Sequence, residues 1–221
     1  MKRLFTAPLL ITLCLCVAAS ISADEAKVPA GPYSTDFSKY PAGKTPEEFY
    51  LLNTQADFKI AEDAGNKFLE LAGNPLDAFG VLYGPEGLVG GELSAKIYGT
   101  TEGKLFPEFG LGVNDSGWKV WLIPGQNALV IRKRDDEKAR VPYSAWKSGT
   151  WTNFRMKLSK AADGKWQIQG KAWPSDGKEP AEWMISTTDD KAPSAGRATI
   201  WGTPYSGTPI RFDDLSVTPD K

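Results

Sequence analysis

Histidine is absent from the 221-residue chain, and this absence removes more chemistry than any other feature of its composition. Imidazole is the general base of the usual serine and cysteine triads and the commonest ligand of zinc. Sites of those kinds are therefore excluded in their usual forms. Catalysis by this chain would have to use carboxylates, lysine, tyrosine or a metal held by oxygen ligands.

Long apolar runs are also missing, apart from one short run at the N-terminus. Lys2 and Arg3 precede the apolar residues 9–19, and small residues follow as far as Ala23. This layout is typical of a secretory signal peptide, and we place cleavage after Ala23. The run is too short for a membrane span, which needs about 20 apolar residues, and no later segment approaches that length. We expect residues 1–23 to be removed and the chain to be exported to the periplasm or the cell exterior.

Cysteine occurs only at Cys14 and Cys16, inside that signal segment, so the exported chain would contain no disulfide. Its stability would then depend on the size of its core, and the remaining length is sufficient for one domain. Removing Lys2 and Arg3 leaves 24 basic and 27 acidic residues, a formal charge of −3. This balance argues against a nucleic-acid partner or an anionic membrane surface.

No segment of ten or more residues has a convincing helical period, whereas two-residue alternation is frequent. Trp151–Ser159 and Trp166–Trp173 both alternate, and the turn residues 161–164 separate them. This pattern predicts an antiparallel hairpin, which a short strand at Trp183–Ile185 extends to a meander. The residues expected on its buried face are Phe154, Met156, Leu158, Trp166 and Ile168.

Similar short alternating runs are found from residue 58 to residue 217. We expect residues 24–35 to form a linker or loose arm, residues 36–218 to form one domain, and Glu47–Leu52 to make at most one helical turn. The other expected strands are Phe58–Ile60, Lys67–Leu71, Phe79–Tyr83, Glu92–Tyr98, Leu105–Asn114, Trp118–Ile123, Ala128–Arg134, Arg197–Trp201 and Arg211–Val217. About a dozen short strands without a long helix predict an all-β antiparallel β-sandwich of the jelly-roll type, with a barrel as the alternative layout.

Three patterns give the region from Gly91 to Thr218 a family resemblance. They are the stretches Gly149–Leu158, Lys171–Trp183 and Phe212–Val217. Together they resemble the concanavalin A-like, laminin-G-like β-sandwich domains of secreted bacterial proteins. Such domains bind glycans, cap larger enzymes or hydrolyse glycosidic bonds, so the resemblance implies the fold and leaves the function to be argued from the site.

Catalytic residues are sparse by comparison with enzymes of this superfamily. Laminarinase-type glucanases carry two glutamates flanking an aspartate on one strand, and this chain has no such array. Glu92 and Glu108 share the polar side of two different strands and are the weak candidates for a cross-strand pair, although surface glutamates are far commoner. The 3-keto-disaccharide hydrolase-like domains share the stretch at Gly149–Asn153, but their Asn-Ser-Gly strand is matched only loosely at 114–117.

Eight tryptophans offer a second kind of site, because sugars stack their apolar faces on aromatic rings. The alternation places Trp118 and Trp166 in the core and Trp121, Trp173 and Trp201 on the polar side. We expect one or more of these three to line a glycan groove unless a loop covers them. Their expected hydrogen-bonding neighbours are Glu108, Arg155 and Gln169.

Asp213 is spaced by two residues from the apolar Leu215 and by four from Val217, so the alternation places it on the same buried face. A buried carboxylate is costly unless it is paired or bound to metal. The resemblance implies a structural calcium near the final strand, for which Asp36 and the backbone near Gly43 would be the other ligands. The alternative is an aspartate that accepts backbone N–H bonds at a strand end, with no cofactor.

Three functions fit these observations. The favoured one is a non-catalytic exported domain that binds a glycan or another cell-surface polymer. The second is a carboxylate-based glycoside hydrolase, and the third is a purely structural module of a larger assembly.

Overall fold

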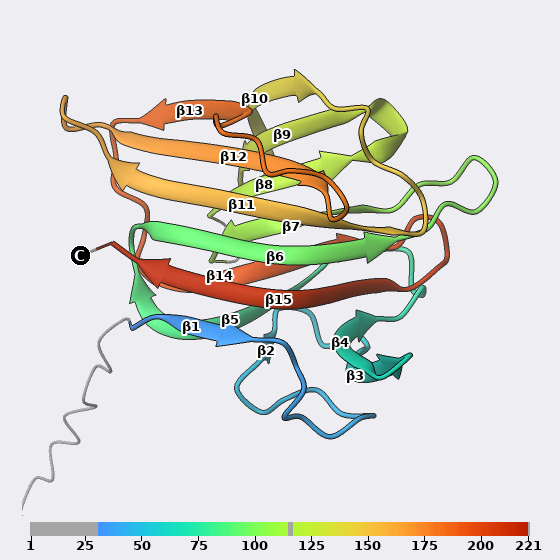
Figure 1. Ribbon diagram of the computed structural model, residues 1–221. Helices are drawn as coiled ribbons and strands as arrows, with labels where there is room; N and C mark the ends of the chain where they lie inside the picture. The colour runs from blue at the N-terminus through green and yellow to red at the C-terminus, as the bar shows by residue number, and fades with distance from the viewer. Residues whose placement is uncertain (1–30, 115–116, 221) are drawn as a thin grey trace, which may run out of the picture.

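The structure is a computed structural model that describes residues 31–114 and 117–220, and within them the strands form two antiparallel sheets packed face to face (Figure 1). The order along sheet A is β13 (Ile185–Asp189), β12 (Trp166–Pro174), β11 (Thr150–Lys160), β6 (Gly91–Gly99), β15 (Ile210–Pro219), β4 (Asn66–Leu71) and β3 (Phe58–Asp63), with β1 (Tyr33–Thr35) also paired to β15. The order along sheet B is β10 (Asp136–Pro142), β9 (Ala128–Lys133), β8 (Trp118–Ile123), β7 (Glu108–Val113), β14 (Gly196–Thr203), β5 (Phe79–Leu88) and β2 (Tyr50–Leu51). The predicted sandwich is confirmed.

The core lies between the two sheets and is made by alternate residues of nearly every strand. Phe154, Met156 and Leu158 of β11 and Ile168 of β12 are fully buried there, as the alternation predicts. Trp166 is partly buried against the same cluster, and Trp118 belongs to it. The predicted meander is also confirmed, because β12 pairs with both β11 and β13. Its third strand, however, is Ile185–Asp189 and shares only Ile185 with the predicted Trp183–Ile185.

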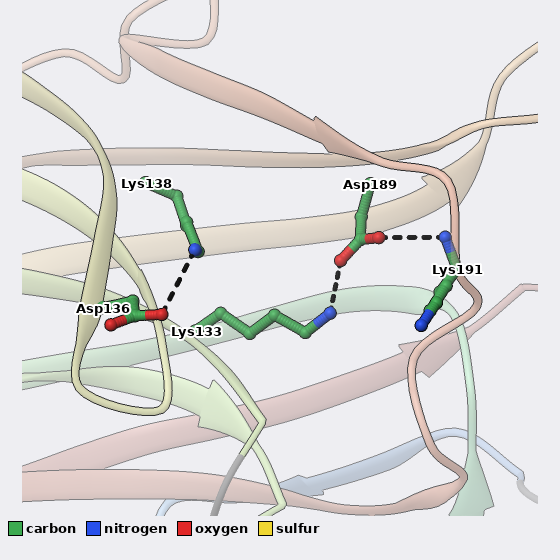
Figure 2. Close-up of polar contacts among 5 residues, drawn as sticks. All are labelled: Lys133, Asp136, Lys138, Asp189 and Lys191. Atoms are coloured by element: carbon green, nitrogen blue, oxygen red, sulfur yellow. Dashed lines mark hydrogen bonds and ion pairs between the residues drawn. The ribbon is translucent and has the colours of Figure 1, made fainter.

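The two sheets are joined at the edge where β10 and β9 approach β13 (Figure 2). Lys133 of β9 forms an ion pair with Asp189 at the end of β13, and the same carboxylate accepts a hydrogen bond from the backbone N–H of Lys191. These partners, the Lys133 hydrogen bond first, hold the pKa of Asp189 below its usual value. The contact therefore ties sheet A to sheet B at one side of the sandwich.

Several element boundaries differ from the sequence expectations. The predicted signal segment and most of the expected linker lie outside the described residues, but Tyr33–Thr35 form β1, so the folded region starts before the predicted Asp36. Residues 47–52 contain β2 and no helical turn. β10 has no counterpart among the expected strands, because its exposed, mostly charged residues show no clear alternation. β7 begins at Glu108, three residues later than predicted.

Candidate functional site

A pocket of about 500 Å³ opens on the outer face of sheet B, on the side away from the core. The residues around it come from β7, β8, β9 and β14, from the turn after β9 and from the loops beside β5 and β14. They are Ala78, Glu108, Lys119, Trp121, Arg132, Arg134, Asp135, Trp201, Thr203 and Tyr205. The pocket thus combines aromatic rings with charges of both signs.

Strand register explains why the two tryptophans meet there. Trp121 of β8 and Trp201 of β14 are both direct cross-strand neighbours of Gly110 on the intervening β7. Their inward neighbours along each strand, such as Leu122 and Ile200, belong to the core, so both indoles project to the outer face. There they form a second apolar cluster with Ile123, Ala128 and Val130.

Glycine provides the room that these rings occupy. The ring of Trp201 lies over Gly80 of β5, where an added Cβ would come within 2.8 Å of three indole carbons. Gly110, the cross-strand neighbour of both tryptophans, places no side chain between them. Two large rings can therefore lie on a sheet surface without separating its strands.

Both indole N–H groups are satisfied inside the pocket wall. Trp121 Nε1 donates to Glu108 Oε2 at 2.9 Å, and Trp201 Nε1 donates to Thr199 Oγ1 at 2.9 Å. The hydroxyl of Thr203 donates to the backbone oxygen of Glu108 at 3.1 Å. These contacts fix the rings and the carboxylate relative to one another.

Cations lie against the two rings. Lys119 Nζ is 3.7 Å from the ring centroid of Trp201, and the guanidinium carbon of Arg132 is 5.7 Å from that of Trp121. The two tryptophans are only 4% and 7% exposed, so little of either ring is bare. Tyr205, in contrast, is 43% exposed and offers an open aromatic face at the rim.

The structure brings together only half of the predicted binding residues. Trp121, Trp201 and Glu108 line the pocket on sheet B. Trp173, Arg155 and Gln169 lie on β11 and β12, on the outer face of sheet A. Two of the three tryptophans thus share a pocket with Glu108, but the expectation that Arg155 and Gln169 are their neighbours is wrong, because the same outward parity on two packed sheets gives two opposite surfaces.

The outer face of sheet A is occupied by an ion network of the chain itself. Glu179, in the connection between β12 and β13, contacts Lys171 at 2.7 Å and Arg155 at 3.1 Å. Arg155 also contacts Glu92 at 3.2 Å, and Lys171 donates to the backbone oxygen of Pro180 at 2.9 Å. Several polar groups of this surface are thus committed to internal partners.

The catalytic pair Glu92 and Glu108 is wrong for the same reason. Glu92 is on β6 in sheet A, opposite Lys157 and paired with Arg155, and Glu108 is on β7 in sheet B. Their neighbours Leu93 and Phe109 both point into the core, so the two carboxylates face away from each other on opposite surfaces. They cannot flank one glycosidic bond, which requires carboxyl groups about 5 to 10 Å apart.

The suggested calcium ligands do not form a cage. Asp213 is buried, and its oxygens accept hydrogen bonds from Asn66 Nδ2 at 2.9 Å and from the N–H of Asp214 at 2.8 Å. Asp36 is exposed and accepts from the backbone and the hydroxyl of Ser38. In the described part of the chain no three acidic, cysteine or histidine residues cluster as metal ligands would. The residues present therefore fit a hydrogen-bonded aspartate better than a resident calcium, but Asp213 lies at a register shift within β15, not at a strand end as the alternative expected.

Asp213 predicts an unusual pH dependence of stability. Burial, reinforced by the charge of Asp214, raises the pKa of Asp213 despite its hydrogen bonds. The folded chain then binds this proton more tightly than the unfolded chain, so stability is lost as the pH rises through the folded-state pKa. Asparagine offers one acceptor where the carboxylate uses two, so Asp213→Asn loses a hydrogen bond at every pH. Because its side chain does not ionise, we expect its free energy of unfolding, relative to that of the parent, to rise as the pH rises from about 4, near the unfolded-state pKa, to 7.

Urea unfolding at several pH values measures the free energy of unfolding of the variant and the parent, with the exposed Asp176→Asn as the control. A difference in stability between Asp213→Asn and the parent that stays constant from pH 4 to pH 7 would contradict the raised pKa. Chelation with EGTA is expected to leave the thermal midpoint unchanged, and a clear fall would restore the calcium hypothesis.

The comparisons with known proteins were made by sequence and by structure. No family model and no curated protein matches the chain. Solved structures do match. Apo Crh5 transglycosylase superposes with a TM-score of 0.56 at 10% identity, over 87% of this chain and 85% of that one. A mutant of alginate lyase Aly36B in complex with alginate trisaccharide gives 0.55 at 11%, over 86% and 99%. The Emp46p carbohydrate recognition domain gives 0.53 at 10%, over 84% and 95%.

The chain has the concanavalin A-like sandwich fold. The fold expected from the resemblance is thus confirmed, whereas identities of this size carry no site residues from one chain to the other. Within the described residues, no helix has the length and apolarity needed to cross a bilayer.

Seven pocket residues were missed from the sequence: Ala78, Lys119, Arg132, Arg134, Asp135, Thr203 and Tyr205. Arg132 follows Val130 by two residues on β9, so the alternation could have placed both side chains on the outer face. Tyr205 and Arg134 lie in turns, where no periodicity exists. In the structure, Arg134 lies at the tight turn after β9 with a left-handed φ of 55°.

Proposed function

We propose that this chain is a non-catalytic domain that binds carbohydrate in the pocket on the outer face of sheet B. The observation that carries the proposal is the pocket itself, in which an exposed tyrosine stands beside two fixed indoles and several hydrogen-bonding side chains. Sugar sites combine an aromatic platform with polar groups in this way. A cell-surface glycan or another extracellular polymer would be the natural partner if the predicted signal segment directs export.

The structural relatives support this choice. They are a transglycosylase, a carbohydrate recognition domain and a lyase in complex with alginate trisaccharide. Carbohydrate is the feature that these otherwise different proteins share. Each is another protein, and the pocket residues above are the basis for extending carbohydrate binding to this one.

Tyr205→Ala tests the pocket with little risk to the fold, because the side chain is largely exposed. We expect at least a tenfold loss of affinity, the equivalent of one stacking contact worth about 1.4 kcal/mol. Affinity electrophoresis against laminarin, xylan, chitosan and polygalacturonate would identify a bound polymer, and calorimetry would give the affinities. Trp173→Ala, on the opposite sheet, is the control and should bind as the parent chain does.

A chain that binds none of these polymers, or a Tyr205→Ala variant that binds unchanged, would contradict the proposal. Release of reducing ends from a bound polymer would instead favour the hydrolase alternative. In that case Glu108 and Asp135 would be the carboxylates to replace, because they are the acidic side chains that line the pocket.

A further inference from the structure

The arginines of this chain divide into two groups by their ion pairs. In the described residues, four arginines contact a carboxylate within 4 Å: Arg140, Arg155, Arg197 and Arg211. The other two, Arg132 and Arg134, form no salt bridge with any described residue, and both line the pocket on sheet B. Among the described residues, the arginines without an ion pair thus both lie at the candidate site; Glu137, the cross-strand neighbour of Arg132 on β10, forms its ion pair with Arg140 instead.

The two carboxylates of the pocket do not compensate these arginines. Glu108 accepts the indole N–H of Trp121, and neither Glu108 nor Asp135 lies within ion-pair distance of Arg132 or Arg134 among the described contacts. Lys119 adds a third cation at the same wall. The pocket therefore has an excess of positive charge in a chain whose formal net charge is −1.

The same cations cover the indole faces that a neutral sugar would need. Lys119 Nζ lies 3.7 Å from the ring centroid of Trp201, and Arg132 lies over Trp121. A neutral sugar would have to displace an ammonium group from an aromatic face to stack there, which forfeits a favourable contact. An acidic sugar can instead contact the cations where they stand and stack on the exposed ring of Tyr205.

We propose that the ligand of this pocket is an acidic polysaccharide, whose anionic groups are bound by Arg132 and Arg134. This inference rests on the proposed carbohydrate function and gives it a substrate class. The planar guanidinium matches a carboxylate with two parallel N–H···O bonds, so a uronic acid suits the pair best. A sulfate ester presents the same kind of anionic oxygens, and the experiment below distinguishes a carboxylated polymer from a sulfated one.

The test uses the full chain and matched polymers in calorimetry at low salt. The first pair is polygalacturonate and the same polymer after chemical reduction of its carboxyl groups, and the second pair is dextran sulfate and dextran. We expect polygalacturonate to bind at least tenfold more tightly than its reduced form, with an affinity that falls as salt is added. Tight binding of dextran sulfate, together with weak binding of polygalacturonate, would support an acidic polysaccharide as the ligand and identify its anionic groups as sulfate esters.

Arg132→Gln and Arg134→Gln should each weaken binding of the acidic polymer about tenfold or more. Arg211→Gln is the matched control, because Arg211 lies on β15 in the other sheet and is paired with Asp63 and Glu70. A thermal melt of each variant shows whether the fold is intact, and Arg132→Lys keeps the charge if Arg132→Gln unfolds. Equal binding of neutral and acidic polymers, or unchanged binding by both glutamine variants, would overturn this inference while the proposed function stands. Binding to no polymer of either kind would overturn both.

Discussion

Gly110→Ala is expected to destabilise the chain by on the order of 3 kcal/mol and to abolish binding in the pocket. A methyl group at this position would come within 2.0 Å of the backbone oxygen of Val120 and 3.0 Å of the Cα of Trp121. The obstacle is the backbone of β8, which cannot move aside as a flexible side chain can. The strands β7 and β8 would have to separate, and the hydrogen bonds between them would weaken.

The same displacement would reach the candidate site. Gly110 pairs with Trp121 on one side and with Trp201 on the other, so a shift of β7 changes the distance between the two indoles. The hydrogen bond from Trp121 to Glu108 would be strained, since Glu108 belongs to the strand that moves. Loss of stability and loss of binding should therefore occur together.

Urea unfolding would measure this effect as a lower midpoint at an unchanged m-value. Gly125→Ala is the control, because the nearest atoms to its added methyl belong to the side chain of Phe106, at 3.3 Å or more. That side chain can shift, and we expect the control to change stability by less than about 1 kcal/mol. If both substitutions cost the same, the close contact with β8 is not the reason that glycine is needed at 110.

The sequence predicted the sandwich because the chain alternates cleanly where one face of a strand is buried. β6 and β11 show this best, since every second residue of each is in the core. β10 was missed because both of its faces meet solvent for most of its length, so no alternation marks it. β1 and β2, of three and two residues, are too short to show a period at all.

The candidate site was predicted only in part, because parity tells which face a residue takes and not which sheet it belongs to. Trp121 and Trp173 are both outward, yet they lie in sheets B and A and cannot share a ligand. The pairing of β7 with β14, which are distant in sequence, is what brings Glu108 and Trp201 together. Such pairings are set by the packing of the whole sandwich, which no local pattern encodes.

Glu179 carries the second large expected effect, because it neutralises a buried lysine. The side chain of Lys171 is only 8% exposed, and its ammonium group contacts Glu179 Oε1 at 2.7 Å and the backbone oxygen of Pro180 at 2.9 Å. The ring of Trp183 lies 4.9 Å from the same nitrogen. All three partners belong to residues 175–184, which connect β12 to β13, so this one cation holds the connection against the outer face of sheet A.

Removing the two partners of this pair should have unequal effects. Glu179→Gln leaves a buried ammonium without its counter-ion, which we expect to cost roughly 2 to 3 kcal/mol, less than a fully buried pair because Glu179 is one-third exposed. Lys171→Met removes the buried charge and keeps the bulk against Trp183, so we expect a cost of about 1 kcal/mol or less. Glu179 would still have Arg155 as a partner.

The double variant distinguishes this explanation from a simple loss of contacts. Once Lys171 is methionine, Glu179→Gln no longer exposes a buried charge, so the double variant should be more stable than Glu179→Gln alone. Urea midpoints of the four chains complete a double-mutant cycle, and limited proteolysis within residues 175–184 reports whether the connection has come loose. Additive costs would show that Glu179 does not act through Lys171. The expected coupling also explains why the outer face of sheet A, although rich in charge, is a weaker candidate for ligand binding than the pocket on sheet B: its central cation already has its anion.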